Sequence, residues 1–362
     1  MLQWGLSPEL PLRILLWSAI GLATALILLV IATGLLQNRA DRRNTRRIAA
    51  FRGWEAVLPG YLFGDGLVPE AFLDIPPEQR PYLRNFLQRL RNSVGGMEGE
   101  RLKTIYQVAG LDRDLHQRLE HRAPRIRATA ALEVWAFGLE AFRPRVLTLL
   151  DDPVAYVAYA AARTLSRSMD LTYARPVFEW VSSQEQYQQN RMLAVLEDFG
   201  PALVPRLAAH LEGTPISHMR WRLFALLVAS HRVPEDQPIL ERLLDSENVE
   251  VQCAAIKAFF AIGDPGIFPR LAPFANHEQP LLRMHLAQVS GSLGGAASLP
   301  LLIGLIEDPV FDIRRHASRS LAELGPPGRE VLRWIALDPT SDPFARDMAL
   351  ERLEWLELRG RL

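Results

Sequence analysis

The sequence is poor in cysteine, in lysine and in net charge, and each shortage excludes a class of protein. Cys253 is the only cysteine among 362 residues, which rules out an intrachain disulfide and a zinc site built from cysteines. Lys103 and Lys257 are the only lysines, so arginine supplies nearly all the positive charge. Basic and acidic residues both number 41. The overall charge therefore indicates neither a nucleic-acid partner nor a strongly acidic one.

One segment lacks charge altogether. From Ile14 to Leu36 no residue is charged, and only Ser18, Thr24 and Thr33 have polar side chains. As a helix that rises ~1.5 Å per residue it would span about 34 Å, enough for a hydrocarbon core of about 30 Å. We therefore expect residues 14–36 to form a transmembrane helix. A cleaved signal peptide is the alternative, but its apolar run would be shorter and no small-x-small cleavage site follows.

The charges beside this segment predict its orientation. Residues 1–13 carry only Arg13 and Glu9, whereas residues 37–52 are rich in arginine. Because arginine is enriched on the cytoplasmic side, we expect an inner (plasma) membrane protein with a short extracytoplasmic N-terminus and a cytoplasmic C-terminal domain. These arginines are also candidates for contact with anionic lipid headgroups, although a role in topology alone explains them. The candidates are Arg39, Arg42, Arg43, Arg46 and Arg47.

A repeat of about 31 residues begins near residue 123 and predicts the fold. A small or apolar residue recurs at one position, and a second apolar residue follows four residues later on the same helical face. The first set comprises Ala130, Ala161, Met192, Leu223, Ala255, Leu286, Ala317 and Met348. The second set comprises Val134, Leu165, Leu196, Leu227, Phe259, Ser290, Leu321 and Arg352. Ser290 and Arg352 break the apolar pattern, the latter in the expected last repeat.

A second helix is expected in each unit, because a proline precedes the next apolar segment. Proline suits a first helical turn, where its missing N–H would have no intrahelical partner. These residues are Pro144, Pro176, Pro205, Pro238, Pro269 and Pro300. Gly263, Gly294 and Gly325 lie where turns between paired helices are expected. The sequence therefore predicts an all-α protein, an α-solenoid of helical hairpins that build one core by stacking.

The segment Asp308–Gly325 carries the repeat pattern most fully. An aspartate precedes the first helix, a β-branched residue precedes Arg314, Ala317 lies at the close helix crossing, and a glycine ends the unit. This segment resembles the short HEAT repeat of the bilin-lyase type, and the resemblance extends over residues ~123–357 of an expected solenoid at residues 123–362. It implies the fold and says little about function, because HEAT arrays serve many unrelated roles.

Two units depart from this pattern. Asp152-Pro153 opens a second good copy, but Ala158 replaces the typical arginine. The unit near Glu185 is degenerate, with Gln188 and Met192 at the usual apolar and small positions. Carboxylates at the turns between units, such as Asp152, are expected to cap the following helices.

Residues 53–122 are less regular and are expected to form a helical N-terminal cap or divergent repeats; a separate small domain is the alternative. Residues 54–63 predict a short element broken at Pro59-Gly60, and residues 81–90 have helical spacing. Residues 102–119 predict one or two further helices. No long linker is present, so we expect a single body after the membrane segment.

Motifs that carry chemistry are absent. The sequence has no P-loop, no Gly-x-Ser-x-Gly and no His-Glu-x-x-His, and its eight histidines are scattered. We therefore expect no catalytic residue, no metal, no cofactor and no enzymatic activity.

The resemblance instead directs attention to the second helices, which line the concave side of HEAT solenoids and commonly bind partners. Arginines and tryptophans at polar positions of these helices are candidate partner-binding residues, although solvated side chains also explain them. The candidates are Arg145, Trp180, Arg206, Arg242, Arg270, Arg333 and Trp334.

These observations favour a membrane-anchored scaffold that binds protein partners and organises or regulates a membrane-associated complex, without nucleic acid. By analogy, an envelope-polysaccharide glycosyltransferase is one conceivable client. The alternatives are a bilin lyase-like or other small-ligand-binding enzyme, or a DNA-base glycosylase, which the neutral charge disfavours. A sensor acting on both sides of the membrane is a further alternative, but residues 1–13 are too short to fold alone.

Overall fold

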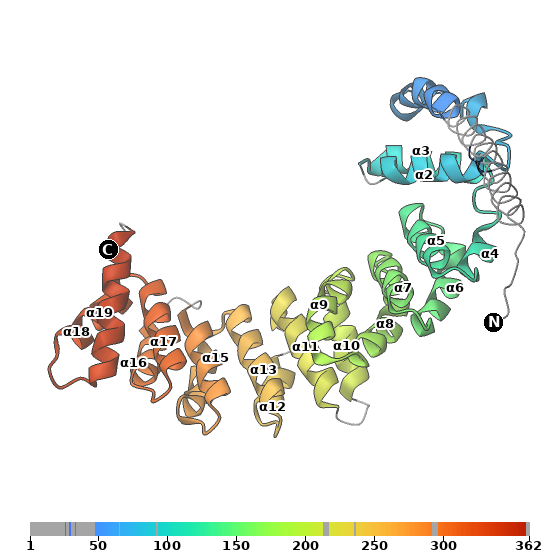
Figure 1. The fold of residues 1–362 in the computed structure, drawn as a ribbon. Coiled ribbons are helices and arrows are strands. Elements are labelled where there is room, and N and C mark those ends of the chain that lie inside the picture. Colours follow the sequence, from blue (N-terminus) through green and yellow to red (C-terminus); the bar gives the residue numbers. More distant parts are fainter. Residues whose placement is uncertain are drawn as a thin grey trace, which may run out of the picture. The chain divides into compact units, whose positions relative to one another are not determined.

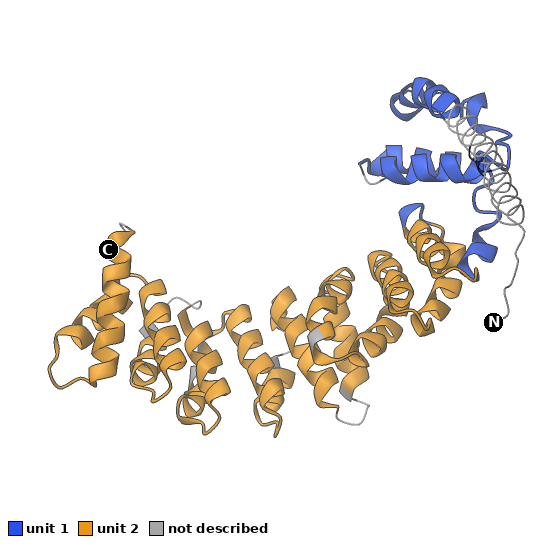
Figure 2. Cartoon of the chain, in the orientation of Figure 1, with its two compact units in different colours: residues 1–120, 136–138 blue, residues 121–135, 139–362 orange. Residues whose placement is uncertain are grey.

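The computed structural model describes residues 26, 29, 33, 48–64, 66–91, 93–212, 217–234, 237–291 and 296–359. The regular elements of these residues are helices. They divide into two compact units instead of the single body expected (Figure 2). Unit 1 comprises residues 1–120 with 136–138, and unit 2 comprises residues 121–135 with 139–362.

Unit 1 begins its described part with a helix over residues 48–63. The other helices of unit 1 are η1 (Glu70–Phe72), α2 (Arg80–Arg91), α3 (Gly96–Val108) and α4 (Leu115–Leu119). The helices α2, α3 and α4 fall where the apolar spacing predicted them.

The predicted break at Pro59-Gly60 is wrong, because the first helix of unit 1 runs through both residues. Proline and glycine disfavour a helix interior by about 3 and 1 kcal/mol. Against this, four large side chains on one face of the helix are each less than a tenth exposed. These are Trp54, Leu58, Tyr61 and Leu62. Burial of this face contributes about 1.5–3 kcal/mol per side chain and outweighs the local preference.

Unit 2 is a stack of helix pairs, so the predicted α-solenoid is confirmed (Figure 1). Its first helices hold the aligned repeat segments, and they are α5 (Pro124–Ala136), α7 (Ala155–Arg167), α9 (Gln186–Glu197), α11 (His218–His231), α13 (Val249–Ile262), α15 (Pro280–Ser290), α17 (Phe311–Glu323) and α19 (Pro343–Leu358). Its second helices are α6 (Arg143–Thr148), α8 (Ala174–Ser182), α10 (Leu203–Glu212), α12 (Gln237–Leu244), α14 (Phe268–Leu271), α16 (Leu299–Ile306) and α18 (Pro326–Leu337). The predicted prolines all lie within the first three residues of their helices.

Short 3-10 turns complete the connections of unit 2. They are η2 (Glu140–Phe142), η3 (Leu149–Asp151), η4 (Leu171–Tyr173), η6 (Pro265–Ile267), η7 (Ala272–Asn276) and η9 (Ala296–Ser298). Gly263 and Gly325 have φ angles of +83° and +78°, a left-handed conformation that glycine adopts without steric cost. Both therefore end a first helix as expected, whereas Gly294 lies outside the described residues.

Close helix contact explains Ser290, which broke the apolar pattern. Ser290 is fully buried, and its hydroxyl donates to the carbonyl oxygen of Leu286 at 2.6 Å. A Cβ on the neighbouring Gly291 would lie 2.7 Å from the Cα of Ser320, so only glycine permits this approach of α15 to α17. The Ser320 hydroxyl in turn donates to the carbonyl oxygen of Ala287 at 2.7 Å. Small polar side chains thus fit here because each finds a backbone acceptor.

Buried ion pairs link consecutive repeats. Arg127 bonds Asp152 with 2.7 and 2.9 Å contacts, and Arg283 bonds Asp308 with 2.6 and 3.2 Å contacts. Both aspartate side chains are only 4% exposed. Each also accepts the backbone N–H two residues later, at 2.9 and 2.8 Å, and so fixes the turn into the next helix rather than bonding its first turn. The bond from Arg127 is the main reason why the pKa of Asp152 is lowered.

Three arginines at the same repeat position also bind the chain that precedes their own helix. Nη1 of Arg127, Arg283 and Arg314 donates to the carbonyl oxygens five and six residues earlier, at distances from 2.6 to 3.2 Å. We call these three residues the seat arginines. We call each pair of carbonyl oxygens, together with the space in front of it, an arginine seat. Four other repeats have no arginine at this position and carry Ala158, Gln189, Gln252 or Ala345 instead.

Candidate anion-binding site

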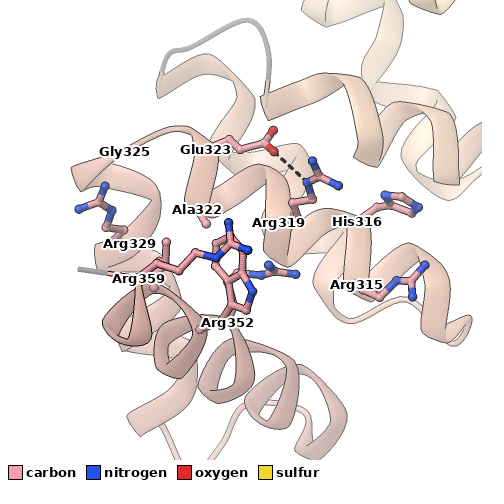
Figure 3. A pocket seen from close by; sticks show the side chains of 11 residues that line it. Arg315, His316, Arg319, Ala322, Glu323, Gly325, Arg329, Arg352 and Arg359 are labelled. Atoms are coloured by element: carbon pink, nitrogen blue, oxygen red, sulfur yellow. Dashed lines mark hydrogen bonds and ion pairs between the residues drawn. The ribbon is translucent and has the colours of Figure 1, made fainter. Parts of the chain in front are cut away.

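A basic pocket of about 720 Å³ lies among α17, α18 and α19 in unit 2 (Figure 3). Its lining consists of Arg315, His316, Arg319, Ala322, Glu323, Gly325, Arg329, Arg352, Trp355, Leu356 and Arg359. We call it the arginine pocket. In Figure 3 the side chains of Arg319, Arg352 and Arg359 project into the same space.

Helical spacing produces the lining. On α17, Arg315 and Arg319 are four residues apart and therefore neighbours on one face, while the buried Ala317 and Leu321 occupy the face that packs into the core. Arg352 on α19 and Arg359, the residue directly after α19, lie seven residues apart, about two helical turns. Two amphipathic helices thus present their basic faces to a common pocket.

The pocket has more cationic groups than its own chain satisfies. Its lining contains five arginines and one carboxylate, Glu323, which accepts from Arg319 at 2.9 Å. Arg315 pairs with Asp312 at 3.4 Å, and both side chains are more than half exposed. Nε of Arg329 and Nε of Arg352 are buried and lack a hydrogen-bond partner. Buried donors are normally paired, so these two point to a missing acceptor.

Two pKa shifts in the pocket have burial as their main cause and nearby cations as a further cause. The pKa of Arg352 is lowered, mainly by burial and further by the cations of Arg319 and Arg315, against the opposing effect of Glu351. The pKa of His316 is also lowered, again mainly by burial and then by Arg315. Burial and like charge both disfavour a cation. A bound anion would relieve both groups.

Trp355 organises two of the arginines. The guanidinium carbons of Arg359 and Arg352 lie 4.3 and 5.3 Å from its ring centroid. Both distances are within the range of a cation–π interaction, worth about 0.5–1 kcal/mol at an exposed site. The ring therefore limits the positions of the two guanidinium groups before any ligand arrives, which lowers the entropic cost of binding.

This arrangement suits recognition of an anion more than bond making. Planar guanidinium groups match carboxylate and phosphate oxygens in charge and geometry. Within the described parts of the chain, no three His, Cys, Asp or Glu side chains lie close enough together to bind a metal ion. The thiol of Cys253 is buried, and burial raises its pKa to about 12, so it stays protonated at neutral pH.

Comparison with known proteins agrees with the architecture. Residues 237–322, from α12 to most of α17, match the family model of HEAT repeats. This part of the chain consists of HEAT repeats. The fold implied by the resemblance of Asp308–Gly325 to a HEAT unit is therefore confirmed.

One characterised relative of this chain is human deoxyhypusine hydroxylase. It is 25% identical over 131 residues, which cover 35% of this chain and 43% of the hydroxylase. The match thus spans less than half the length of that enzyme.

Three solved structures are similar to this chain over most of its length. The structure of human deoxyhypusine hydroxylase with glycerol covers 86% of this chain and 98% of its own, at 15% identity and a TM-score of 0.29. Kap121p covers 85% of this chain and 43% of its own, at 12% identity and a TM-score of 0.36. An engineered protein covers 78% of this chain and 89% of its own, at 15% identity and a TM-score of 0.34.

The seven residues predicted to bind partners all lie on second helices, but they do not converge on the arginine pocket. Arg145, Arg206, Arg333 and Trp334 are exposed on α6, α10 and α18. Arg270 on α14 pairs with Asp245 at 3.0 Å. Their role as a binding row stays a prediction.

Two of the seven line smaller hollows in the HEAT solenoid. Trp180 lines one of about 620 Å³ near α7 and α9, and Arg242 lines one of about 500 Å³ near α11 and α13. The predicted row thus touches two hollows without forming one continuous site in the described residues.

The predicted membrane elements fall mostly beyond the described structure. The transmembrane segment 14–36 lies outside the described residues except at Leu26, Leu29 and Thr33, which are helical. The five membrane-proximal arginines at positions 39–47 lie outside them entirely. None of the helices in the described residues is both long and apolar enough to cross a membrane.

The arginine pocket was not predicted, because its cations come from three helices and no local motif joins them. The sequence held one signal. Arg352 stands where the repeat pattern requires an apolar residue, and in the structure it is half-buried in the pocket. A charged residue at a core position of a repeat indicates a candidate binding group.

Proposed function

We propose that this chain is a membrane-anchored scaffold whose HEAT solenoid binds an acidic segment of a protein partner in the arginine pocket. The observation that carries the proposal is the pair of buried Nε donors on Arg329 and Arg352 that have no acceptor in their own chain. A carboxylate or phosphate of the partner would accept these bonds and offset the burial that, together with neighbouring cations, lowers the pKa of Arg352.

The membrane part of the proposal rests on the sequence. Residues 14–36 would anchor the chain in the inner membrane, and the arginines at positions 39–47 would keep the solenoid on the cytoplasmic side. Anchoring would concentrate the pocket beside membrane-bound partners, so that modest intrinsic affinity suffices. A membrane-associated protein complex is therefore the proposed client, and an envelope-polysaccharide glycosyltransferase is one candidate by analogy.

Direct binding tests the pocket first. A labelled hexaglutamate peptide is titrated into the full-length protein in detergent, and the double variant Arg329→Gln/Arg352→Gln is compared with Arg206→Gln/Arg333→Gln. The second pair removes the same charge from exposed second-helix positions. We expect binding to weaken at least tenfold for the pocket variant and to stay within twofold for the control. Equal affinity for all three proteins would refute the role of the pocket.

Recovery of a client tests the scaffold. Tagged full-length protein, the pocket double variant, the control variant Arg206→Gln/Arg333→Gln and a form with residues 37–362 are each isolated in detergent, and the co-purifying membrane proteins are identified. A specific membrane protein should be enriched with the wild type, reduced with the pocket variant and reduced when the anchor is absent. Loss with Arg206→Gln/Arg333→Gln alone would move the binding surface to the second-helix row.

A small-ligand or enzymatic function is the second candidate, and the match to human deoxyhypusine hydroxylase favours it. Bilin-binding chemistry belongs to the same class. Absorption spectra of the purified protein and an assay for hydroxylation of deoxyhypusine test this candidate. Turnover, or a bound chromophore that purifies with the protein, would replace the scaffold as the leading function.

A further inference from the structure

The second repeat has an arginine seat without an arginine. Ala158 stands 31 residues after Arg127 and 156 before Arg314, at the position of the seat arginines, and its side chain ends at Cβ. The carbonyls of its seat belong to Asp152 and Pro153, the same dipeptide that in the seventh repeat binds Arg314 at 2.7 and 3.0 Å. The seat that the other repeats fill is therefore available for an outside donor.

A hollow of about 620 Å³ lies at this position. Its lining consists of Leu150, Asp152, Pro153, Ala155, Ala158, Tyr159, Trp180, Gln184, Gln188, Arg191 and Met192. Three of these, Ala158, Gln188 and Met192, are the residues by which this part of the sequence departs from the repeat pattern. Departures that share one hollow indicate a local purpose better than general loss of the repeat.

The chain fills comparable seats elsewhere. In the third repeat, Nε2 of Gln189 donates to the carbonyl oxygens of Ser182 and Gln184, both at 3.0 Å. In the fifth repeat, Nε2 of Gln252 donates to the carbonyl oxygen of Leu244 at 2.9 Å. Ala345 occupies the position in α19; its side chain is buried, as is that of Ala158, but unlike Ala158 it lines none of the three hollows described above. The open seat at Ala158 is thus distinct from its neighbours.

A seat can hold a guanidinium without a carboxylate. Arg314 forms none of the ion pairs in the described structure, yet it is only 8% exposed. Two backbone carbonyls bind it, and its guanidinium carbon lies 5.0 Å from the ring centroid of Phe344 and 5.9 Å from that of Phe311. Carbonyl oxygens and aromatic faces therefore hold this buried guanidinium group, although its Nε has no hydrogen-bond partner.

The open seat offers the same two kinds of contact. Tyr159 and Trp180 supply aromatic surface, and the carbonyls of Asp152 and Pro153 supply acceptors. The carboxylate of Asp152 is already bonded by Arg127 and contributes no free charge. Arg191 brings a like charge to the lining, so the affinity for a single cation should be moderate.

We infer that the open seat binds the guanidinium group of an arginine side chain from a partner protein, which completes in trans the contact that Arg127, Arg283 and Arg314 make within the chain. The inference goes beyond the proposed function, because the arginine pocket on α17 and α19 selects the opposite charge. The two sites share no residue.

The probe is N-acetyl-arginine methylamide, with the citrulline analogue as its neutral match. Both are titrated into full-length protein in detergent, and binding is followed by the midpoint of thermal unfolding and by tryptophan fluorescence, with Trp180→Phe identifying the signal. The arginine compound should stabilise the protein in proportion to its concentration. The citrulline compound should bind at least tenfold more weakly.

Two variants distinguish simple filling of the seat from specific binding of a guanidinium group. Ala158→Arg supplies the missing guanidinium within the chain, so it should raise the unfolding midpoint and abolish binding of the probe. Ala158→Met fills similar space without donors, so it should abolish binding without raising the midpoint. The pocket variant Arg329→Gln/Arg352→Gln should bind the arginine probe as the wild type does, which keeps this test independent of the proposed function.

Each contrary result overturns the inference. Equal affinity for the arginine and citrulline compounds would show that the charge is not recognised. Absence of saturable binding to the wild type, a lower midpoint for Ala158→Arg, or unchanged probe binding by that variant would show that the seat does not accept a guanidinium.

Discussion

The ion-paired seat arginines and the arginines of the pocket are the same residue type but differ in whether their guanidinium groups have partners within the chain. Arg283 is 11% exposed in its side chain and bonds both Asp308 and two backbone carbonyls. Arg352 is half-buried, its Nε has no acceptor, and its pKa is lowered by burial and by neighbouring cations. Arg283 thus holds two repeats together, whereas Arg352 remains available for a ligand.

The largest expected loss of stability comes from replacing an arginine that is buried and ion-paired. Arg283→Met leaves the carboxylate of Asp308 buried without its counter-charge, so the free energy of unfolding should fall by about 3–5 kcal/mol. Urea unfolding followed by circular dichroism measures the change. Arg315→Met is the control on the next repeat, because its pair with Asp312 is largely exposed and should contribute less than about 1 kcal/mol. Equal losses would remove the distinction between the two classes.

The repeat architecture was predictable because it depends on local rules that recur. Proline at the start of second helices and a small residue at each crossing are visible in the sequence, and stacking follows from them. The break predicted at Pro59-Gly60 was wrong because local preference alone favours a break there. The helix is stabilised by burial of Trp54 and its neighbours, through tertiary contacts that no local pattern shows.

A buried histidine extends the comparison to a third kind of basic group. His285 on α15 is mostly buried, its Nδ1 lacks a hydrogen-bond partner, and its pKa is lowered to about 4. Burial is the main cause, and the nearby Lys257 and His316 add to it against Glu250 and a bond to Gln288. Between pH 6.5 and 4 the imidazole of His285 therefore binds a proton in the unfolded chain but stays neutral in the folded chain.

Stability should thus be complete above pH 6.5 and should decline as the pH falls towards 4, by at most about 3 kcal/mol at about 1.4 kcal/mol per pKa unit. The difference in unfolding free energy between wild type and His285→Gln, measured from pH 7 to pH 4, isolates this contribution. The exposed His121→Gln serves as the control. A constant difference across that range would show that His285 titrates normally in the folded protein.

Substitution of a pocket arginine should change the free energy of unfolding in the opposite direction to substitution of Arg283. Arg352→Met removes a cation that burial and the neighbouring Arg319 disfavour, and the methionine can keep contact with Trp355. We expect the free energy of unfolding to rise by about 0.5–1 kcal/mol while anion binding weakens. The exposed Arg359→Met is the control and should leave stability nearly unchanged. A loss comparable to that of Arg283→Met would place Arg352 among the structural arginines.

The candidate site lay beyond sequence interpretation for a physical reason. Whether an arginine is satisfied depends on acceptors that other helices supply, and those distances appear only in three dimensions. The predicted row on second helices was chosen from polar positions alone, and this criterion cannot separate Arg270, which pairs with Asp245, from an arginine that lacks an acceptor.

His316 supplies the smallest and sharpest test, because its charge reports the ligand. Its pKa lies below the usual value in the free protein, through burial and through Arg315 and Arg319, with Asp312 opposing. An anion bound among these groups favours the protonated imidazole and raises that pKa. Binding is therefore coupled to proton uptake, and affinity should increase severalfold as the pH falls from 7 towards 5.

The anion for this test must keep a constant charge over that range, so a sulfated peptide is preferable to a phosphorylated one, whose second pKa is about 6. His316→Gln should bind nearly as well at pH 7 but lose the increase at pH 5, whereas His277→Gln, outside the pocket lining, should keep it. If the pH dependence persists in His316→Gln, the anion does not reach the imidazole, and the ligand must lie on the α19 side of the pocket, near Arg352 and Arg359.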